Sequence, residues 1–353
     1  MIENEKLADL AEFLFTLVSI ESPPGNEIAA VKYVVNTFRE IGYKADVQFL
    51  HQLSFNIIIN NVKNPDLLIA THIDTVPPIC EARLTGTYKI KGTGSVDAKG
   101  SIAAIYYLLK QIETLPRNVS IAIFSEEESS GGGALTYLLD HTPKNVLIME
   151  PTNLKIANSA TGYLELKLTV SGQHYHPDLV TCYDSDPSVP KKGIKLLAEI
   201  DNFLKRKNLT YSITKIRSDG SDYFIPASFK TEINIHIPPR IKPLDVYRSF
   251  IDEFKHVEEL EIVIDDFSDP IEISEKSFLE KATRAYYEAF GKKPTWYTMP
   301  SWTDATSFVE NGIPSLIFGP GDPSLAHNEN EEIDVRDVAL AGKFLFRLIS
   351  QYT

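Results

Sequence analysis

The length of 353 residues exceeds what one hydrophobic core usually organises, and it predicts two domains. With 43% hydrophobic and 24% charged residues, the composition is that of an ordinary soluble globular protein, and no apolar run is long enough to cross a membrane. A formal net charge of −13 argues against nucleic acid as the main partner.

Two further features bear on the compartment. The N-terminus lacks the basic and apolar regions of a signal peptide. Cys80 and Cys182 are too few for a disulfide framework, and nothing resembles a cysteine-based zinc cluster. We therefore expect a cytoplasmic protein.

The first 160 residues alternate predicted strands with predicted helices. Helices are expected at 4–18, 26–41, 102–112 and 134–140, and strands at 45–50, 55–60, 67–71, 88–91, 118–124 and 145–149. This alternation predicts an α/β domain with a mostly parallel sheet and helices on both faces. Sites in such sheets lie at the carboxyl ends of the strands.

The pattern changes after residue 160 and returns near residue 270. The intervening segment reads as a strand at 163–170, a helix at 187–207, strands at 211–217 and 228–237, a helix at 243–256 and a strand at 260–264. That β-α-β-β-α-β order is typical of a small α+β domain. Helices at 274–290, 304–311 and 334–350, with strands at 296–299 and 314–318, then resume the α/β pattern. We expect a main domain of residues 1–160 and 270–353, interrupted by an inserted domain at 161–269.

Side chains that bind metals follow several of these strands. His72 and Asp74 end the buried strand at 67–71 and point to the same side of it, and a carboxylate beside a histidine commonly orients a metal-binding imidazole. Other strand or loop ends offer Asp97, the glutamates at 126–128, Glu150 and His327. Each of these is more often an ordinary turn or surface residue, but the predicted topology brings all of them to one edge.

The chemistry of this set indicates the kind of metal. Two histidines with several carboxylates and no cysteine suit Zn²⁺, Co²⁺ or Mn²⁺. The surplus of carboxylates favours two ions about 3.5–4 Å apart with one carboxylate between them, an arrangement that activates water for hydrolysis. A glutamate left over beside the ions is suited to act as general base.

Five motifs carry a resemblance to a known family. They are Thr71-His-Ile-Asp-Thr-Val-Pro77, Gly92-Thr-Gly-Ser-Val-Asp-Ala-Lys-Gly100, Glu126-Glu-Glu128 with Gly133-Ala134, Met149-Glu-Pro-Thr152, and Gly319-Pro-Gly321 with His327. Over nearly its whole length the chain resembles the co-catalytic dizinc amidohydrolases and peptidases, which include acetylornithine deacetylase, succinyl-diaminopimelate desuccinylase, aminoacylases and glutamate carboxypeptidases. It looks most similar to the archaeal and thermophile deacylases that release lysine or ornithine from an acyl group or from an acidic amino-group carrier protein.

The resemblance implies a role for each residue of the set. One ion would be bound by His72, Asp97 and Glu150, and the other by Asp97, Glu128 and His327, so that Asp97 bridges the two. Asp74 would orient His72, and Glu127 would be the general base. The glutamate triplet also allows a register shifted to Glu126 and Glu127, but the spacing to Gly133-Ala134 favours Glu127 and Glu128.

The resemblance extends to the inserted domain and to the substrate pocket. His176 matches a histidine that stabilises the oxyanion in the partner's active site, which implies a homodimer formed through the insert. His236 stands where the family often has an arginine, so His236 or Arg240 would contact a substrate carboxylate. Substrate-binding roles are also expected for the pocket-wall residues and a motif glycine: Trp302, Thr303, Asp304 and Gly319.

The resemblance therefore implies a metal-dependent hydrolase of the amide bond of an N-acyl amino acid, namely N-acetyl-lysine, N-acetyl-ornithine or a carrier-linked form, in amino-acid biosynthesis. The alternatives are a dipeptidase, a carboxypeptidase or a succinyl-diaminopimelate desuccinylase of the same fold, and a metal-binding protein without turnover. The resemblance implies two Zn²⁺ per chain, replaceable by Co²⁺ or Mn²⁺. Expected partners are a small N-acyl amino acid or an acidic carrier protein and a second copy of the chain, with no nucleic acid and no membrane.

Overall fold

The computed structural model describes residues 4–179 and 188–352, and Cys182 lies outside them. The chain divides into two compact units. Unit 1 comprises Met1–Ser159, Ile273–Met299 and Thr303–Thr353, and unit 2 comprises Ala160–Glu272 with Pro300–Trp302. Within the described ranges, every helix is too short or too polar to span a membrane.

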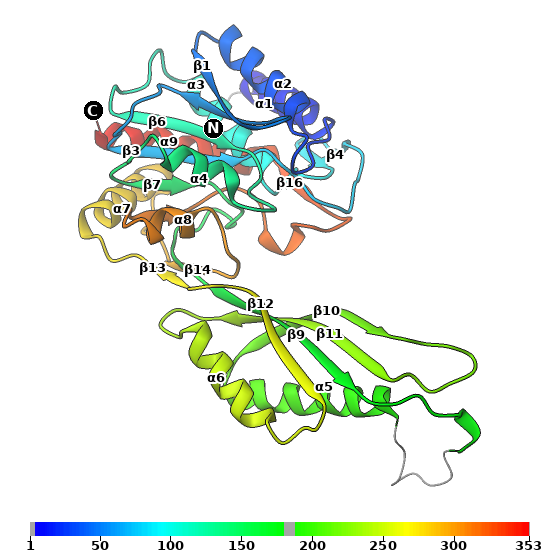
Figure 1. Cartoon of the computed structure of the whole chain (residues 1–353). Coiled ribbons are helices and arrows are strands. Elements are labelled where there is room, and N and C mark those ends of the chain that lie inside the picture. The colour runs from blue at the N-terminus through cyan, green and yellow to red at the C-terminus, as the bar shows by residue number, and fades with distance from the viewer. Residues whose placement is uncertain (1–3, 180–187, 353) are drawn as a thin grey trace. The chain divides into compact units, whose positions relative to one another are not determined.

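The main sheet is mixed, with a parallel centre. Among the described residues it has nine strands in the order β1-β2-β6-β3-β7-β15-β8-β13, and β14 pairs with β8 (Figure 1). Their bounds are β1 (Ala45–His51), β2 (Ser54–Ile59), β3 (Leu67–His72), β6 (Val119–Phe124), β7 (Val146–Ile148), β8 (Ala157–Ala160), β13 (Ile271–Glu272), β14 (Tyr297–Met299) and β15 (Ser315–Ile317). Strands β6, β3, β7 and β15 run parallel, whereas β1–β2, β2–β6 and β15–β8 are antiparallel pairs. The predicted α/β class is confirmed.

Helices cover both faces of this sheet. Strands β3 and β6 are buried at every position, as expected for strands enclosed on two sides. Alternate residues such as Leu67 and Ile69 join the large core formed with α1 (Asn4–Val18), α2 (Ile28–Glu40), α3 (Lys99–Leu109), α7 (Lys276–Phe290) and α9 (Val335–Ile349). On the opposite face, Phe124 contacts the rings of Tyr137 in α4 (Gly132–Leu138) and Phe308 in α8 (Ala305–Glu310).

A small sheet of unit 1 was not predicted. It has the order β16-β5-β4 and consists of β16 (Glu332–Asp334), β5 (Lys89–Lys91) and β4 (Arg83–Gly86). In β16 and β5 the partners are antiparallel, with Ile333 opposite Ile90. Only the strand at 88–91 had been expected, because β4 is exposed throughout and β16 has three residues. This sheet joins the segment after His327 to the segment before Asp97.

Unit 2 follows the predicted β-α-β-β-α-β order. Strands β9 (Gly162–Ser171), β10 (Thr210–Ser218), β11 (Ser228–Ile237) and β12 (Leu260–Ser268) form an antiparallel sheet in the order β10-β11-β9-β12. Helices α5 (Val189–Arg206) and α6 (Pro243–Phe254) cover one face of it (Figure 1). The alternation in β9 and β11 buries one side of each strand, for example Leu166 and Ile233, in a core with Phe203 and Phe250.

The two places where unit 1 is interrupted for the insert lie next to each other. The backbone N–H of Ile273 donates to the carbonyl of Asn158 at 2.7 Å. These two residues belong to unit 1 and flank the segment Ala160–Glu272.

Candidate metal centre

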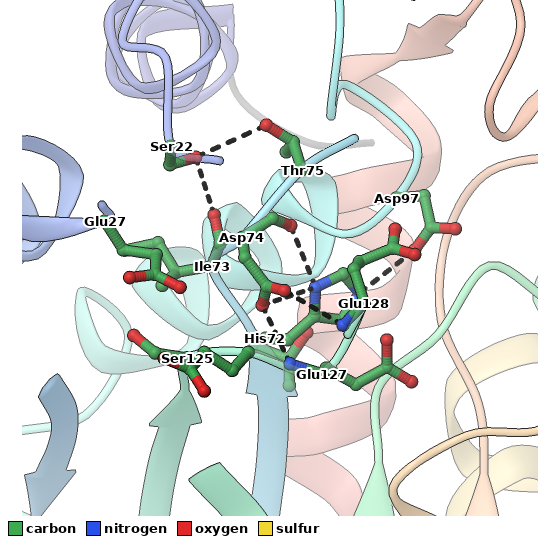
Figure 2. Close-up of polar contacts among 12 residues, drawn as sticks. Ser22, Glu27, His72, Ile73, Asp74, Thr75, Asp97, Ser125, Glu127 and Glu128 are labelled. Carbon is green, nitrogen blue, oxygen red and sulfur yellow. Dashed lines mark hydrogen bonds and ion pairs between the residues drawn. The ribbon is translucent and has the colours of Figure 1, made fainter. Parts of the chain in front are cut away.

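The site begins where β3 ends. His72 is 1% exposed and closes the strand, and Ser22 braces the backbone that follows, because its hydroxyl donates to the carbonyl of Ile73 at 2.8 Å. Figure 2 shows the side chains of His72, Asp74 and Asp97 gathered at this strand end with those of Glu127 and Glu128. Parallel strands deliver their carboxyl ends to one edge, so Glu150 after β7 also lies here.

Two groups of ligand-type atoms share Asp97. In the first, His72, Asp97 and Glu150 each offer an atom within 4.8 Å of the others, and in the second Asp97, Glu128 and His327 do the same. His72 Nε2 lies 3.1 Å from Asp97 Oδ1 and 3.7 Å from Glu150 Oε1. His327 Nε2 lies 2.8 Å from Glu128 Oε1 and 3.6 Å from Asp97 Oδ2. All five residues that the sequence nominated as metal ligands are thus brought together.

The donor set fits divalent cations. The groups contain imidazole nitrogens and carboxylate oxygens without sulfur, a combination suited to Zn²⁺, Co²⁺ or Mn²⁺. Glu150 Oε1 is buried and makes no hydrogen bond within the described parts of the chain. A buried carboxylate oxygen that accepts no hydrogen bond is costly, and a bound cation would offset that cost.

Burial and crowding of like charges shift the proton affinities of these groups. Burial raises the pKa of Glu150 to about 7, although His72 opposes it. Burial also raises the pKa of Glu127 well above its ordinary value, against the attraction of His72. Burial alone would lower the pKa of His72, but the surrounding carboxylates, foremost Glu150 and Glu127, together outweigh it and raise that pKa well above its ordinary value. The hydrogen bond to Glu128 raises the pKa of His327 to about 9. The metal-free site therefore holds protons that cations would displace.

Asp74 contacts the backbone of Glu127 and Glu128 as well as the side chain of His72. Its carboxylate lies 3.5 Å from His72 Nδ1, while that ring nitrogen is 3.0 Å from the backbone carbonyl of Asp74. The same carboxylate accepts the backbone N–H groups of Glu127 at 3.2 Å and Glu128 at 2.9 Å. One side chain therefore contacts both the first histidine and the backbone of the acidic pair (Figure 2).

The three glutamates differ in their surroundings. Glu126 pairs with His51 and accepts from the hydroxyl of Ser130 at 3.2 Å, and it belongs to none of the ligand groups found among the described residues. Glu127 offers an oxygen within 4.8 Å of ligand atoms of His72 and Glu128. This geometry favours the register in which Glu127 and Glu128 form the acidic pair.

The substrate-binding candidates of unit 1 are buried beside these groups. Thr303 and Asp304 are buried, and Asp304 Oδ1 makes no hydrogen bond within the described ranges. Burial raises the pKa of Asp304 well above its ordinary value, opposed by His72 and assisted by Glu150. Gly319 packs on the backbone of Glu150, where a Cβ atom would lie 2.4 Å from the Glu150 carbonyl oxygen. Gly319 thus supports a candidate ligand.

The remaining candidates belong to unit 2. His176 is exposed, and its Nδ1 accepts the backbone N–H of Asp178 at 3.2 Å. The Nδ1 of His236 lies 3.5 Å from the hydroxyl of Thr210. Arg240 donates two hydrogen bonds to Glu272, at 2.7 and 2.9 Å, so a substrate carboxylate would have to replace Glu272 there. Trp302 is half-buried.

Sequence reasoning missed Glu331. This residue is 3% exposed, and its carboxylate accepts three backbone N–H groups of the loop that carries Asp97. An acidic residue in an Asn/Glu-rich segment resembles a surface residue, and the sequence carries no signal of this contact.

Comparison with known proteins identifies the family. Residues 68–351 match peptidase family M20/M25/M40, and the chain belongs to this family. It is 24% identical to the LysW-lysine/LysW-ornithine hydrolase of Sulfurisphaera tokodaii, over 94% of this chain and 92% of the relative. A tripeptidase from Staphylococcus aureus has a similar fold, with a TM-score of 0.78, 17% identity and 99% of both chains covered. A dinuclear metal binding peptidase from Bacillus subtilis also has a similar fold, with a TM-score of 0.70, 15% identity and 99% of both chains covered. The chain is thus a metallohydrolase, and a dinuclear metal site is typical of its family.

Proposed function

We propose that this enzyme hydrolyses the amide bond of an N-acylated basic amino acid and releases lysine or ornithine from a small acyl group or an acidic amino-group carrier protein. The observation that carries the hydrolytic part is the sharing of Asp97 by two ligand groups, with Glu127 beside them. The substrate class is supported by relatives of nearly equal length that are named LysW-lysine/LysW-ornithine hydrolases.

In this proposal each ligand group holds one divalent ion. His72, Asp97 and Glu150 bind the first, Asp97, Glu128 and His327 bind the second, and the ions are Zn²⁺, with Co²⁺ or Mn²⁺ as substitutes. Bound ions of this kind activate a water molecule and polarise the amide carbonyl. The pKa shifts above support the assignment, because two cations would offset the crowded negative charge of the buried carboxylates.

Glu127 is the proposed general base. Its backbone N–H is held by Asp74, and its side chain lies beside His72 and Glu128. It would take a proton from the attacking water as the new C–O bond forms, and would then deliver that proton to the leaving amine nitrogen as the amide C–N bond breaks.

His176 and a second chain complete the proposal. The family resemblance assigns His176 to the oxyanion of the partner's site, where a single hydrogen-bond donor is worth about 3–4 kcal/mol. A homodimer through the insert is supported by β10, a long exposed strand at one edge of the four-stranded sheet. His236, Arg240, Trp302, Thr303 and Asp304 are each proposed to contact the substrate.

A peptidase is the second candidate. The segment Thr303-Asp304-Ala305 resembles the peptidases of the family slightly more than the deacetylases. A peptidase would use the same site, with a dipeptide in place of the acylated amino acid.

Hydrolysis of a substrate panel tests the proposal. The purified protein is assayed with added Zn²⁺ or Co²⁺ on N-acetyl-lysine, N-acetyl-ornithine, a carrier protein bearing lysine, N-succinyl-diaminopimelate and several dipeptides. Release of lysine or ornithine at the highest kcat/KM is the expected result, and preference for dipeptides would favour the second candidate. Metal binding without turnover on any compound would favour a binding protein. A Glu127→Gln variant, prepared in parallel, controls for contaminating hydrolases.

A further inference from the structure

One buried carboxylate ties together the backbones of two loops that carry proposed metal ligands. Glu331 Oε1 accepts the N–H groups of Val96 at 2.9 Å and Asp97 at 3.0 Å, and Oε2 accepts that of Gly94 at 2.9 Å. Three backbone donors around one carboxylate form an anion-binding concavity. Because one of the donors is the N–H of Asp97 itself, the contact fixes the residue that both ligand groups share.

The backbone of Glu331 makes a second connection to the same loop. Its carbonyl accepts the N–H of Gly92 at 3.0 Å, directly before the pairing of β16 with β5. Its own N–H donates to the carbonyl of Asn328 at 3.1 Å, one residue after His327. The turn that carries His327 is therefore closed on Glu331, and Glu331 is fastened to residues 92–97 through both its side chain and its backbone.

We propose that Glu331 is a positioning residue for the dinuclear site and that it sets the distance between Asp97 and His327. The inference rests on the proposed metal site, and it adds a residue that binds neither metal nor substrate. A residue in this place acts mainly on the second group, since Asp97 and His327 both belong to that group. The first group takes only Asp97 from the fastened loops.

The chemistry of the contact favours glutamate over its amide. A carboxylate presents acceptors on both oxygens, and all three donors here are backbone N–H groups. In a Glu331→Gln variant, the amide nitrogen would turn a donor toward at least one of these N–H groups, which leaves a buried donor unpaired. Glu331→Asp would keep the charge but withdraw the carboxylate by one methylene.

The test is a metal titration of folded, metal-free protein, with competing chelators to resolve the two binding events and the Co²⁺ absorption spectrum to report coordination. For Glu331→Gln we expect the ion of the second group to lose about 10- to 100-fold in affinity, as is usual for residues that orient ligands, with a smaller loss for the ion of the first group. Glu331→Asp should also lose affinity, although its charge is preserved.

Glu332→Gln is the matched control. Glu332 is the next residue, and its carboxylate pairs with Lys89 at 2.7 Å at the protein surface. The substitution removes the same charge without touching the loop of residues 92–97, so both ions should bind as in the unmodified chain. An equal loss in this variant would assign the effect to net charge and overturn the proposal.

The remaining outcomes are also decisive. If the unmodified chain binds two ions and folded Glu331→Gln binds them equally well, Glu331 has no positioning role, while the metal site stands. If the unmodified chain binds no ion, the metal site itself is wrong. Far-UV circular dichroism and thermal unfolding without metal establish folding. Should Glu331→Gln not fold, Glu331→Asp carries the test, and loss of the fold in both variants would make Glu331 a structural residue.

Discussion

At the residue scale, the site is a concentration of buried acids around two histidines. Glu150, Glu127 and Asp304 are held where burial raises the pKa of each, although His72 lies among them. Such an arrangement is unfavourable without cations, and strongly shifted proton affinities are common at functional sites. Glu127 and Glu128 are neighbours in the sequence but have different roles in the proposal, and this difference can be measured.

Replacing each glutamate separately distinguishes base from ligand. Glu127→Ala should lower kcat by about 10²- to 10⁴-fold with nearly unchanged metal content, because a general base contributes this much and is not required for binding. Glu128→Ala should lose metal, since its carboxylate belongs to the group with Asp97 and His327. Elemental analysis of both purified variants decides the matter. The reverse pattern, with metal lost from Glu127→Ala and kept by Glu128→Ala, would show that the register is wrong by one residue.

Metal binding should depend on pH in a definite direction. The pKa of His327 in the metal-free protein is raised to about 9, above the value near 6.5 of an unfolded chain. The protonated His327–Glu128 pair therefore stabilises the metal-free fold fully below about pH 6.5, and this contribution disappears as pH rises through about 9. A metal ion needs the neutral imidazole and competes with its proton.

We therefore expect affinity for Zn²⁺, and the gain in unfolding temperature that Zn²⁺ gives, to increase from about pH 6 to about pH 9. Activity should fall as pH drops through the histidine range and be partly restored by excess metal. Calorimetry in buffers of different ionisation enthalpy would detect the released protons. A loss of activity in acid that added metal does not change would point to another titrating group.

At the element scale, the predictable elements are those with a long or periodic signal. Strand β6 was predicted because its six apolar or small residues are unbroken, and β9 because its burial alternates. The strands β4, β8, β13 and β16, of two to four residues each, were missed, and unlike the equally short β7 and β15 they contain no two adjacent large apolar residues. The five nominated ligands could be found because each follows a predicted strand or lies in a distinctive loop. Glu331 could not, because its partners are backbone N–H groups about 234 residues away along the chain.

Gly319, which follows β15, should not tolerate a larger side chain. In Gly319→Ala the new Cβ would meet the carbonyl oxygen of Glu150 at 2.4 Å, a backbone atom that cannot rotate away. Overpacking of this kind costs about 1–3 kcal/mol, and here it would also displace a candidate ligand. We expect a lower unfolding temperature and reduced metal content. Gly86→Ala, whose Cβ would make only ordinary contacts at 3.8 Å, is the control and should change neither.

At the scale of the whole molecule, the proposed dimer predicts that two inactive chains can complement each other. If His176 serves the partner, a dimer of one Glu127→Ala chain and one His176→Ala chain has one site with both residues intact. Random exchange of equal amounts makes half of the dimers mixed, so activity should return to about one quarter of the unmodified level.

The assay needs conditions under which subunits are shown to exchange, for example by mass labelling. If His176 acted within its own chain, every site in the mixed dimer would keep one lesion. Activity would then stay at the level of the separate variants, and the proposal of a shared site would be wrong.

The adjacency of Asn158 and Ile273 makes the interrupted domain a modular one. Because one hydrogen bond joins these flanking positions, a short reverse turn would be enough to span the gap that the segment Ala160–Glu272 now spans. Every strand of the parallel centre lies outside that segment. Insertions, deletions or exchange of the segment would therefore leave in place the strands that carry the proposed metal ligands. Selection for a new partner or a new acyl group can act on one part of the gene while the other is preserved.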